Sequence, residues 1–176
     1  MHKRQFLRVL TPAFLAGVTV VRAETYLTVD QAGRMLCEGE KLTAAGITLT
    51  AAQKKAIQDA SGVRVRSLTL QAWKTSSGGW FIVDQVLGKH EYIDYAIALK
   101  ADGSVRGIEI LTYRETYGSE INNAKWRAQF TGKKAGAALK LDDDIRNISG
   151  ATLSSNHITE GVRRIVHTWA LALKDR

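Results

Sequence analysis

The chain has 176 residues, of which 45% are hydrophobic, and a formal net charge of +8. This length predicts a single domain that is large enough to bury a core. Cys37 is the only cysteine, which excludes an internal disulfide. Lysine and arginine do not cluster with aromatic residues, so we predict no nucleic-acid partner.

The first 23 residues have the pattern of a cleaved export signal. A basic start at residues 1–8 precedes a largely apolar run at residues 9–21, and the small residue Ala23 stands at the expected cleavage site. The apolar run is too short to span a bilayer as a helix. We therefore expect residues 1–23 to be removed and the mature chain, from Glu24 onward, to be periplasmic. A retained N-terminal anchor is the alternative.

Two short helices are predicted between residues 24 and 62, with a loop at residues 39–46 between them. Each helix would begin at a capping box, in which a threonine side chain and a glutamine side chain satisfy each other's backbone N–H groups. We therefore expect residues 24–62 to form a helical N-terminal part. The two boxes are Thr28 with Gln31 and Thr50 with Gln53.

Strand patterns dominate the next fifty residues. Residues 68–73 and 80–87 are separated by Thr-Ser-Ser-Gly-Gly, which is typical of a hairpin loop. Apolar residues alternate with polar or small ones over residues 93–99, and a tight turn leads into residues 105–113. Sequential strands joined by tight turns predict an antiparallel sheet.

A short helix is predicted at residues 122–130, and a long one ends the chain. Apolar residues recur at helical spacing from Ile158 to Leu173, and Glu160 can pair with Arg164 four positions later. The fold class is therefore α+β, an antiparallel sheet flanked by helices with a long C-terminal helix. Residues 63–176 would form the core of one domain that spans residues 24–176.

The start of the long helix is the most informative feature. Residues 149–155 read Ser-Gly-Ala-Thr-Leu-Ser-Ser, and the first N–H groups of a helix have no internal partner. With the helix dipole, they make a binding site for an anion such as phosphate, and Gly150 leaves room for a close approach. The alternative is an ordinary helix start capped by Thr152 or Ser154.

This stretch resembles the attachment motif of the covalent FMN-binding domain family. Members include the C subunit of the sodium-pumping NADH:quinone oxidoreductase and the G subunit of the Rnf complex. Two further family motifs, Glu-Thr-x-Gly and Trp-x-x-Gln-Phe-x-Gly, occur upstream in the family's order, and the resemblance covers roughly residues 90–170. The matching upstream residues are Glu115, Thr116, Gly118, Trp126, Gln129, Phe130 and Gly132.

The resemblance implies that Thr152 carries FMN as a phosphoester and that the flavin ring lies in a groove. Trp126, Tyr117 or Phe130 would pack on the ring, and Gln129 would bond to its polar edge. For Trp126 and Phe130, packing in the core is the alternative. An extracytoplasmic flavin transferase would install the FMN from FAD. The implied cofactor-binding residues are Thr152, its motif neighbours Ser149, Gly150, Ala151, Leu153 and Ser154, and the upstream residues Glu115, Thr116, Tyr117, Gly118, Trp126, Gln129 and Phe130.

The chain departs from the family pattern at three positions. Relatives often have proline after Glu-Thr and a second glycine shortly after the first, where this chain has Tyr117 and Glu120. Relatives also often have aspartate three residues before the motif serine, where this chain has Arg146. The departures concern the flavin pocket and recognition by the transferase, respectively.

Two other groups could suggest metal binding, but we predict no metal site. His90 and Glu91 are adjacent residues without a suggested third ligand, so a solvated turn is the favoured interpretation. The three aspartates at residues 142–144 are interpreted as an exposed acidic loop rather than a magnesium site. No nucleophile–base set stands out, so we assign no catalytic residues.

The sequence therefore predicts an exported electron-transfer flavoprotein with FMN on Thr152, an electron carrier or redox subunit rather than a stand-alone enzyme. Its partners would be the flavin transferase and membrane or exported redox proteins. One alternative is a non-catalytic sensory or interaction module that binds flavin on the same fold. Another is an interaction domain without a cofactor.

Overall fold

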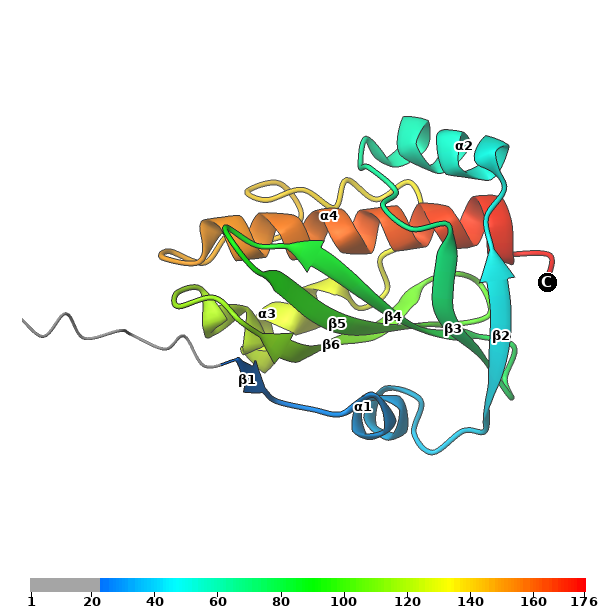
Figure 1. Ribbon diagram of the computed structural model, residues 1–176, viewed down its shortest axis with the longest axis horizontal. Helices are drawn as coiled ribbons and strands as arrows, with labels where there is room; N and C mark the ends of the chain where they lie inside the picture. Colours follow the sequence, from blue (N-terminus) through cyan, green and yellow to red (C-terminus); the bar gives the residue numbers. More distant parts are fainter. Residues whose placement is uncertain (1–22) are drawn as a thin grey trace, which may run out of the picture.

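The computed structural model describes residues 23–176 of the chain (Figure 1). The predicted export signal, apart from Ala23, lies outside these described residues. Within residues 23–176, no helix combines the length and the apolar character that crossing a membrane requires.

One six-stranded antiparallel sheet forms the centre of the fold, in the strand order β1-β6-β5-β4-β3-β2. The four strands predicted between residues 68 and 113 are confirmed as β3 to β6, each within two residues of its expected ends. The strands are β1 (Glu24–Thr25), β2 (Leu42–Thr48), β3 (Thr69–Thr75), β4 (Trp80–Leu87), β5 (Tyr92–Leu99) and β6 (Val105–Tyr113).

The N-terminal part is not wholly helical, because the loop predicted at residues 39–46 is wrong. Residues Leu42–Thr48 form β2, which pairs with β3 along its whole length at the edge of the sheet. Only Ile47 of this strand is buried. Two alanines and Gly46 also weaken its strand pattern, so an exposed edge strand resembled a loop.

Both predicted capping boxes are confirmed, and each begins a helix. In α1 (Val29–Leu36), the N–H of Gln31 donates to Thr28 Oγ1 at 3.2 Å, and the N–H of Thr28 donates to Gln31 Oε1 at 2.8 Å. Thr50 and Gln53 make the same pair of bonds in α2 (Ala51–Ser61). These bonds satisfy N–H groups that the first turn of each helix would otherwise leave free.

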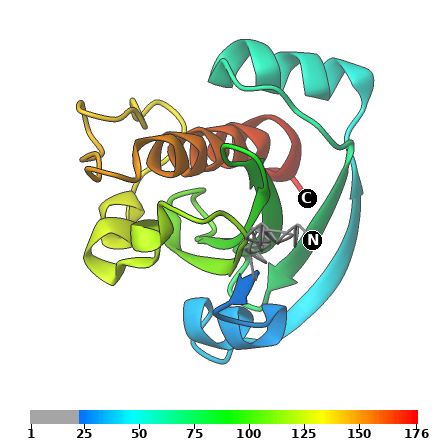
Figure 2. The same ribbon diagram turned by 60° about the vertical axis from the view of Figure 1, so that its left-hand side comes forward.

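Helices cover both faces of the sheet. The long helix α4 (Thr152–Thr168), which continues as η3 (Trp169–Leu173), lies across one face, and α1 lies on the opposite face (Figure 2). α2 packs beside α4. The fold class predicted from the sequence is confirmed.

The alternation of side chains along β5 explains the two cores. Ile93, Tyr95, Ile97 and Leu99 are buried in the cluster that includes the apolar side of α4. The intervening alanines at residues 96 and 98 face the smaller cluster under α1, which also contains Cys37. Because successive side chains of a strand point to opposite faces, small residues leave room for α1 to lie close to the sheet.

Between β6 and α4 the chain forms short helical segments and then an irregular stretch. The segments are η1 (Ser119–Asn122), α3 (Ala124–Arg127) and η2 (Ala128–Phe130), so the short helix predicted at residues 122–130 is confirmed as two consecutive pieces. Residues 131–151 then return the chain to the start of α4. This route brings the end of β6 and the start of α4 together.

Candidate functional site

The attachment motif lies where α4 begins. Thr152 is the first residue of the helix and its side chain is exposed. The residue before the helix is Ala151, and no side chain of the described residues caps this end. The interpretation of Thr152 or Ser154 as an ordinary capping residue is therefore wrong, and the first N–H groups of α4 have no intrahelical partner.

The chain reaches this helix end through a left-handed glycine. Gly150 has φ +86°, and a side chain built there would meet no atom of residues 23–176 within 4 Å. The surface in front of the first turn of α4 is thus open. Leu153, the second residue of the helix, is half-exposed beside Thr152 in the sequence.

A hydroxyl pair joins the attachment motif to the Glu-Thr-x-Gly motif. The side chain of Ser154 is buried, and its Oγ lies 2.8 Å from Tyr113 Oη. The Tyr113 hydroxyl donates to the carbonyl oxygen of Tyr117, so the Ser154 hydroxyl donates to Tyr113. We call this arrangement of Ser154, Tyr113 and the Tyr117 carbonyl the hydroxyl bridge.

The conformation of Gly118 allows this close approach. Gly118 has φ +98°, and a Cβ atom there would lie 2.6 Å from Tyr113 Oη and 2.7 Å from Ser154 Oγ. Burial raises the pKa of Tyr113, although its bond to Ser154 lowers it in part, so the phenol stays protonated as a donor. Tyr113 was not predicted as a site residue, because a buried tyrosine at a strand end has the pattern of a core residue.

Glu115 organises the turn between β4 and β5. Its Oε1 accepts the N–H groups of His90 at 2.5 Å and Glu91 at 2.9 Å. Burial raises the pKa of Glu115, but the backbone N–H bonds outweigh burial and lower it below its ordinary value. Lys89, His90 and Glu91 are exposed, which confirms a solvated turn.

The acidic residues 142–144 are tied to neighbouring basic and backbone groups. Asp144 Oδ2 pairs with Lys133 Nζ at 2.9 Å, and its Oδ1 accepts the N–H of Lys140 at 2.9 Å. Asp142 and Asp143 are exposed. In the described part of the chain, no three His, Cys, Asp or Glu residues are grouped as metal ligands.

The Trp-x-x-Gln-Phe motif clamps the backbone that leads to the attachment motif. Trp126 Nε1 donates to the carbonyl oxygen of Arg146 at 2.7 Å, and Gln129 Oε1 accepts the N–H of Arg146 at 2.8 Å. Both main-chain groups of one residue are thus held by two side chains. The Nε2 of Gln129 also donates to the carbonyl oxygen of Trp126, at 3.2 Å.

The aromatic side chains of the predicted flavin groove differ in exposure. Phe130 is fully buried, Trp126 is almost fully buried, and their rings pack edge to face with centroids 5.1 Å apart. Tyr117 is 83% exposed. The structure therefore places Trp126 and Phe130 in the hydrophobic core, and only Tyr117 of the three presents its ring at the surface.

Asn147 is a polar contact of Thr152 that the sequence interpretation missed. Its Nδ2 donates to Thr152 Oγ1 at 3.2 Å. Its Oδ1 is buried and has no hydrogen-bond partner in the described part of the chain. An asparagine five residues before a helix threonine carries no recognisable sequence pattern, so only the fold shows this pair.

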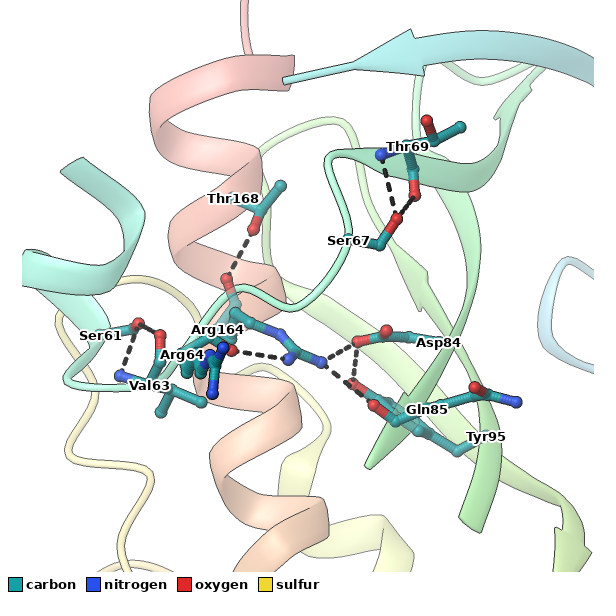
Figure 3. Close-up of polar contacts among 10 residues, drawn as sticks. All are labelled: Ser61, Val63, Arg64, Ser67, Thr69, Asp84, Gln85, Tyr95, Arg164 and Thr168. Atoms are coloured by element: carbon teal, nitrogen blue, oxygen red, sulfur yellow. Dashed lines mark hydrogen bonds and ion pairs between the residues drawn. The ribbon is translucent and has the colours of Figure 1, made fainter. Parts of the chain in front are cut away.

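A second polar cluster lies further along α4 (Figure 3). Arg164 is buried; its guanidinium pairs with Asp84 and donates to the carbonyl oxygen of Arg64 at 3.1 Å. The Tyr95 hydroxyl donates to the same Asp84 carboxylate at 3.0 Å. Burial, and then the charge of Asp84, raise the pKa of Tyr95 well above its ordinary value, so it remains a donor.

The predicted pair of Glu160 with Arg164 is therefore wrong. Glu160 accepts a bond from Asn156 Nδ2 at 3.0 Å, and Arg164 turns instead to the sheet. Tertiary contacts of the buried Arg164 with the partly buried Asp84 outweigh the few tenths of a kcal/mol that an exposed helix pair contributes.

A cleft of about 650 Å³ opens near this cluster. β3 pairs with β4 only at Gln71–Lys74, so the two strands separate beyond Val83, and Arg164 and Asp84 are among the lining residues. Arg164 is twelve residues after Thr152, or about 18 Å along the helix axis. None of the predicted flavin-site residues lines this cleft.

Comparison with known proteins shows which family the chain resembles. Residues 88–167 match the model of the FMN-binding domain family. The chain is 35% identical over 81 residues to the G subunit of the proton-translocating ferredoxin:NAD(+) oxidoreductase complex of Clostridium ljungdahlii, covering 42% of this chain and 44% of that protein. It is 30% identical over 126 residues to the C subunit of the Na(+)-translocating NADH-quinone reductase of Pasteurella multocida, covering 60% and 48%.

A third relative is the G subunit of the Na(+)-translocating ferredoxin:NAD(+) oxidoreductase complex of Acetobacterium woodii, 31% identical over 80 residues, or 40% of this chain and 39% of that protein. The chain thus spans less than half the length of these curated relatives. The matches confirm the resemblance to the FMN-binding domain family over residues 88–167.

The residues at the start of α4 fit a flavin phosphate. The Thr152 hydroxyl is exposed, and the N–H groups of the first helical turn are uncapped, which suits a phosphate group. Gly150 leaves the approach open. The Nδ2 group of Asn147 donates to the Thr152 hydroxyl and so holds it at this position. These are properties of a site that another group completes rather than of a closed helix start.

Proposed function

We propose that the chain is an exported electron-transfer flavoprotein that carries FMN as a phosphoester on Thr152. The observation that carries this proposal is the exposed Thr152 hydroxyl on an uncapped helix end, inside a Ser-Gly-Ala-Thr motif of an FMN-binding domain. Esterification at this atom would place the phosphate beside the free N–H groups and the positive end of the helix dipole.

Two segments support the bound cofactor from opposite sides of the motif. The hydroxyl bridge fixes Ser154 against the segment that contains Gly118. The clamp of Trp126 and Gln129 fixes the backbone at Arg146. The helix start is therefore held in place by buried side chains, while the hydroxyl of Thr152 itself stays accessible.

Tyr117 and Leu153 offer the exposed apolar surface for the flavin ring. Tyr117 is 83% exposed and Leu153 is 50% exposed, although both are large apolar side chains. Each adjoins a residue of the site in sequence, Tyr117 next to Gly118 and Leu153 next to Thr152. An exposed aromatic and an exposed aliphatic side chain at one site are suited to a flat apolar ligand.

A covalent bond suits a carrier that works outside the cytoplasm. FMN, when bound, supplies one- and two-electron chemistry, and the protein supplies its position and tunes its potential. The ester at Thr152 keeps the cofactor at an effective concentration in the millimolar range. The surface of the site can then stay open to redox partners without loss of the cofactor.

The proposal includes export and two kinds of partner. The basic and apolar pattern of residues 1–23 supports export to the periplasm. The attachment motif supports recognition by an extracytoplasmic flavin transferase that uses FAD. The relatives are subunits of ion-translocating oxidoreductases, which supports an electron donor or acceptor in a membrane complex or among exported redox proteins.

The test is the intact mass of the chain after coexpression with a flavin transferase. Wild-type protein should gain the mass of one FMN less one water, as ester formation requires, and it should fluoresce in a denaturing gel. Thr152→Val keeps the shape of the side chain and removes its hydroxyl, so the added mass and the fluorescence should both disappear. Thr43→Ala, at an exposed threonine of β2, is the matched control and should be flavinylated like wild type.

Retention of covalent flavin by Thr152→Val would show that another residue carries the ester. Flavin that leaves wild-type protein on denaturation would show non-covalent binding only. If the wild type is flavinylated but no redox protein of the native compartment reoxidises it after reduction, electron transfer is wrong and a sensory module is favoured.

A further inference from the structure

The amide of Asn147 is the side-chain group that contacts the proposed acceptor atom. Its Nδ2 donates to Thr152 Oγ1 at 3.2 Å, and no other side chain of the described residues bonds to that oxygen. We infer that Asn147 is the positioning residue for flavin attachment, holding the Thr152 hydroxyl in the direction from which it reacts. This inference rests on the proposed function and adds a residue to it.

The backbone around Asn147 is fixed on both sides. The preceding residue, Arg146, has its N–H and its carbonyl oxygen bound by Gln129 and Trp126. The following residue, Ile148, accepts the N–H of Ala151 at 3.0 Å in the turn that leads to α4. A short side chain between two fixed backbone points has little freedom, so its amide can set the direction of a neighbouring hydroxyl.

The chemistry of attachment changes what Thr152 Oγ1 can do in a hydrogen bond. Oγ1 attacks the phosphorus of the FMN half of FAD, an O–P bond forms, and the P–O bond to AMP breaks. AMP leaves with the bonding pair and the hydroxyl proton passes to a base, with no change in oxidation state. The hydroxyl can donate and accept before the reaction, whereas the ester oxygen can only accept.

An amide is suited to both states of that oxygen. The N–H groups of asparagine donate to the hydroxyl oxygen before the reaction and to the ester oxygen after it. An aspartate of the same size could bind only the hydroxyl, and its charge would repel the incoming phosphate groups. The residue type at position 147 therefore matches the reaction as well as the geometry.

The oxygen end of the Asn147 amide indicates that this residue does not serve to stabilise the fold. Asn147 Oδ1 is buried and has no partner among the described residues. Leaving a buried acceptor unpaired costs about 1–3 kcal/mol. A residue that is unfavourable for folding but bonds to the reacting atom is typical of a functional position.

The experiment measures the rate of attachment rather than the activity of the loaded protein. Purified full-length chain is incubated with FAD and a flavin transferase, and the covalent product is followed by mass spectrometry to give kcat and KM for the chain. Asn147→Ala and Asn147→Asp should each lower kcat roughly tenfold, as expected for the loss of one orienting hydrogen bond, with KM changed less than about twofold.

Asn156→Ala is the matched control, because Asn156 also donates from Nδ2 to a neighbour, Glu160, but lies in the second turn of α4. Its kcat should equal that of wild type. Thermal unfolding identifies any variant that fails to fold. If Asn147→Ala does not fold, the test depends on Asn147→Asp, which keeps the size of the side chain. Equal melting temperatures with a lowered kcat would separate positioning from a structural role.

Wild-type kcat in Asn147→Ala or in Asn147→Asp would overturn the inference and leave the proposed function intact. A rise in KM with unchanged kcat would also overturn it, since Asn147 would then serve recognition by the transferase. Absence of covalent flavin in the wild type would overturn the proposed function and this inference together.

Discussion

Two stretches of the same helix, twelve residues apart, treat polar groups in opposite ways. At the start of α4, Thr152 is exposed, the first N–H groups are uncapped and the amide oxygen of Asn147 has no partner in the described chain. Around Arg164, the charged group is buried, paired with Asp84 and bonded to a backbone carbonyl. We call the start of α4 together with Asn147 the open stretch, because some of its polar groups have no hydrogen-bond partner in the described chain. We call the surroundings of Arg164 and Asp84 the closed stretch, because their polar groups are paired.

The contrast indicates that the start of α4 serves the proposed attachment reaction, whereas the contacts around Arg164 stabilise the fold. A buried ion pair with additional hydrogen bonds fixes the position of α4 on the sheet, and removing one partner leaves the other uncompensated. An open helix end contributes less to folding, but it can accept a ligand without first breaking a bond. The helix can therefore be held firmly by its middle and present a reactive start.

The largest expected effect comes from the closed stretch. Arg164→Met should reduce the free energy of unfolding by about 3–5 kcal/mol, because the partly buried Asp84 carboxylate loses its counter-charge. Urea unfolding measures this loss. The extent of flavin attachment below the unfolding transition should be unchanged. The double variant Asp84→Asn with Arg164→Met should recover part of the stability, and a single-variant loss below about 1 kcal/mol would contradict the contrast.

The second-largest effect is expected for a substitution of Gly118, which should change both the stability of the fold and the rate of flavin attachment. Gly118→Ala forces alanine into a left-handed conformation and drives its Cβ to 2.7 Å from Ser154 Oγ, so we expect a loss of about 2–4 kcal/mol. Displacement of Ser154 should also slow flavin attachment. Both are measured on the same samples, by urea unfolding and by mass spectrometry.

Gly136→Ala is the matched control for this prediction. Gly136 has φ +99°, close to that of Gly118, but a side chain there would meet no atom within 4 Å among the residues that the structure describes. It should lose only the backbone contribution of about 1–2 kcal/mol, with normal attachment. Equal behaviour of the two variants would show that contact between Gly118 and the hydroxyl bridge has no role.

The closed stretch was harder to predict from the sequence than the open one. Local patterns identified both capping boxes, strands β3 to β6, α4 and the attachment motif, because each depends on neighbours within a few residues. The sequence suggested Glu160 as the partner of Arg164, since the actual partner, Asp84, is 80 residues away in sequence. Tertiary pairing of this kind leaves no local pattern.

The side chains that support the start of α4 could not be predicted from the sequence either. Tyr113 and Asn147 contact the attachment motif through the fold, and neither belongs to a motif. The sequence left open whether Trp126 and Phe130 pack on the flavin ring or in the core, and the structure shows both in the core while Tyr117 is exposed. Motifs identified which segments meet at the site, but only packing shows which side chains face outward.

The smallest effect is expected for alanine substitutions at two neighbouring serines of α4, which test where the open stretch ends. Both are buried, but Ser154 donates to Tyr113 Oη whereas Ser155 Oγ has no partner in the described chain. Ser154→Ala should therefore reduce the free energy of unfolding by about 1 kcal/mol, and it should slow attachment by loosening the hydroxyl bridge. Ser155→Ala removes an unpaired polar atom and should be neutral or slightly stabilising.

Chemical denaturation and attachment rates on the two serine variants check this pair. Because both serines lie in the first turns of the same helix, any general effect of alanine on helix stability is shared and cancels in the comparison. A loss at Ser155 equal to that at Ser154 would mean that burial alone, and not the bond to Tyr113, determines the stability of this end. A loss confined to Ser154 would locate the boundary of the open stretch at the hydroxyl bridge, one residue before the buried body of the helix.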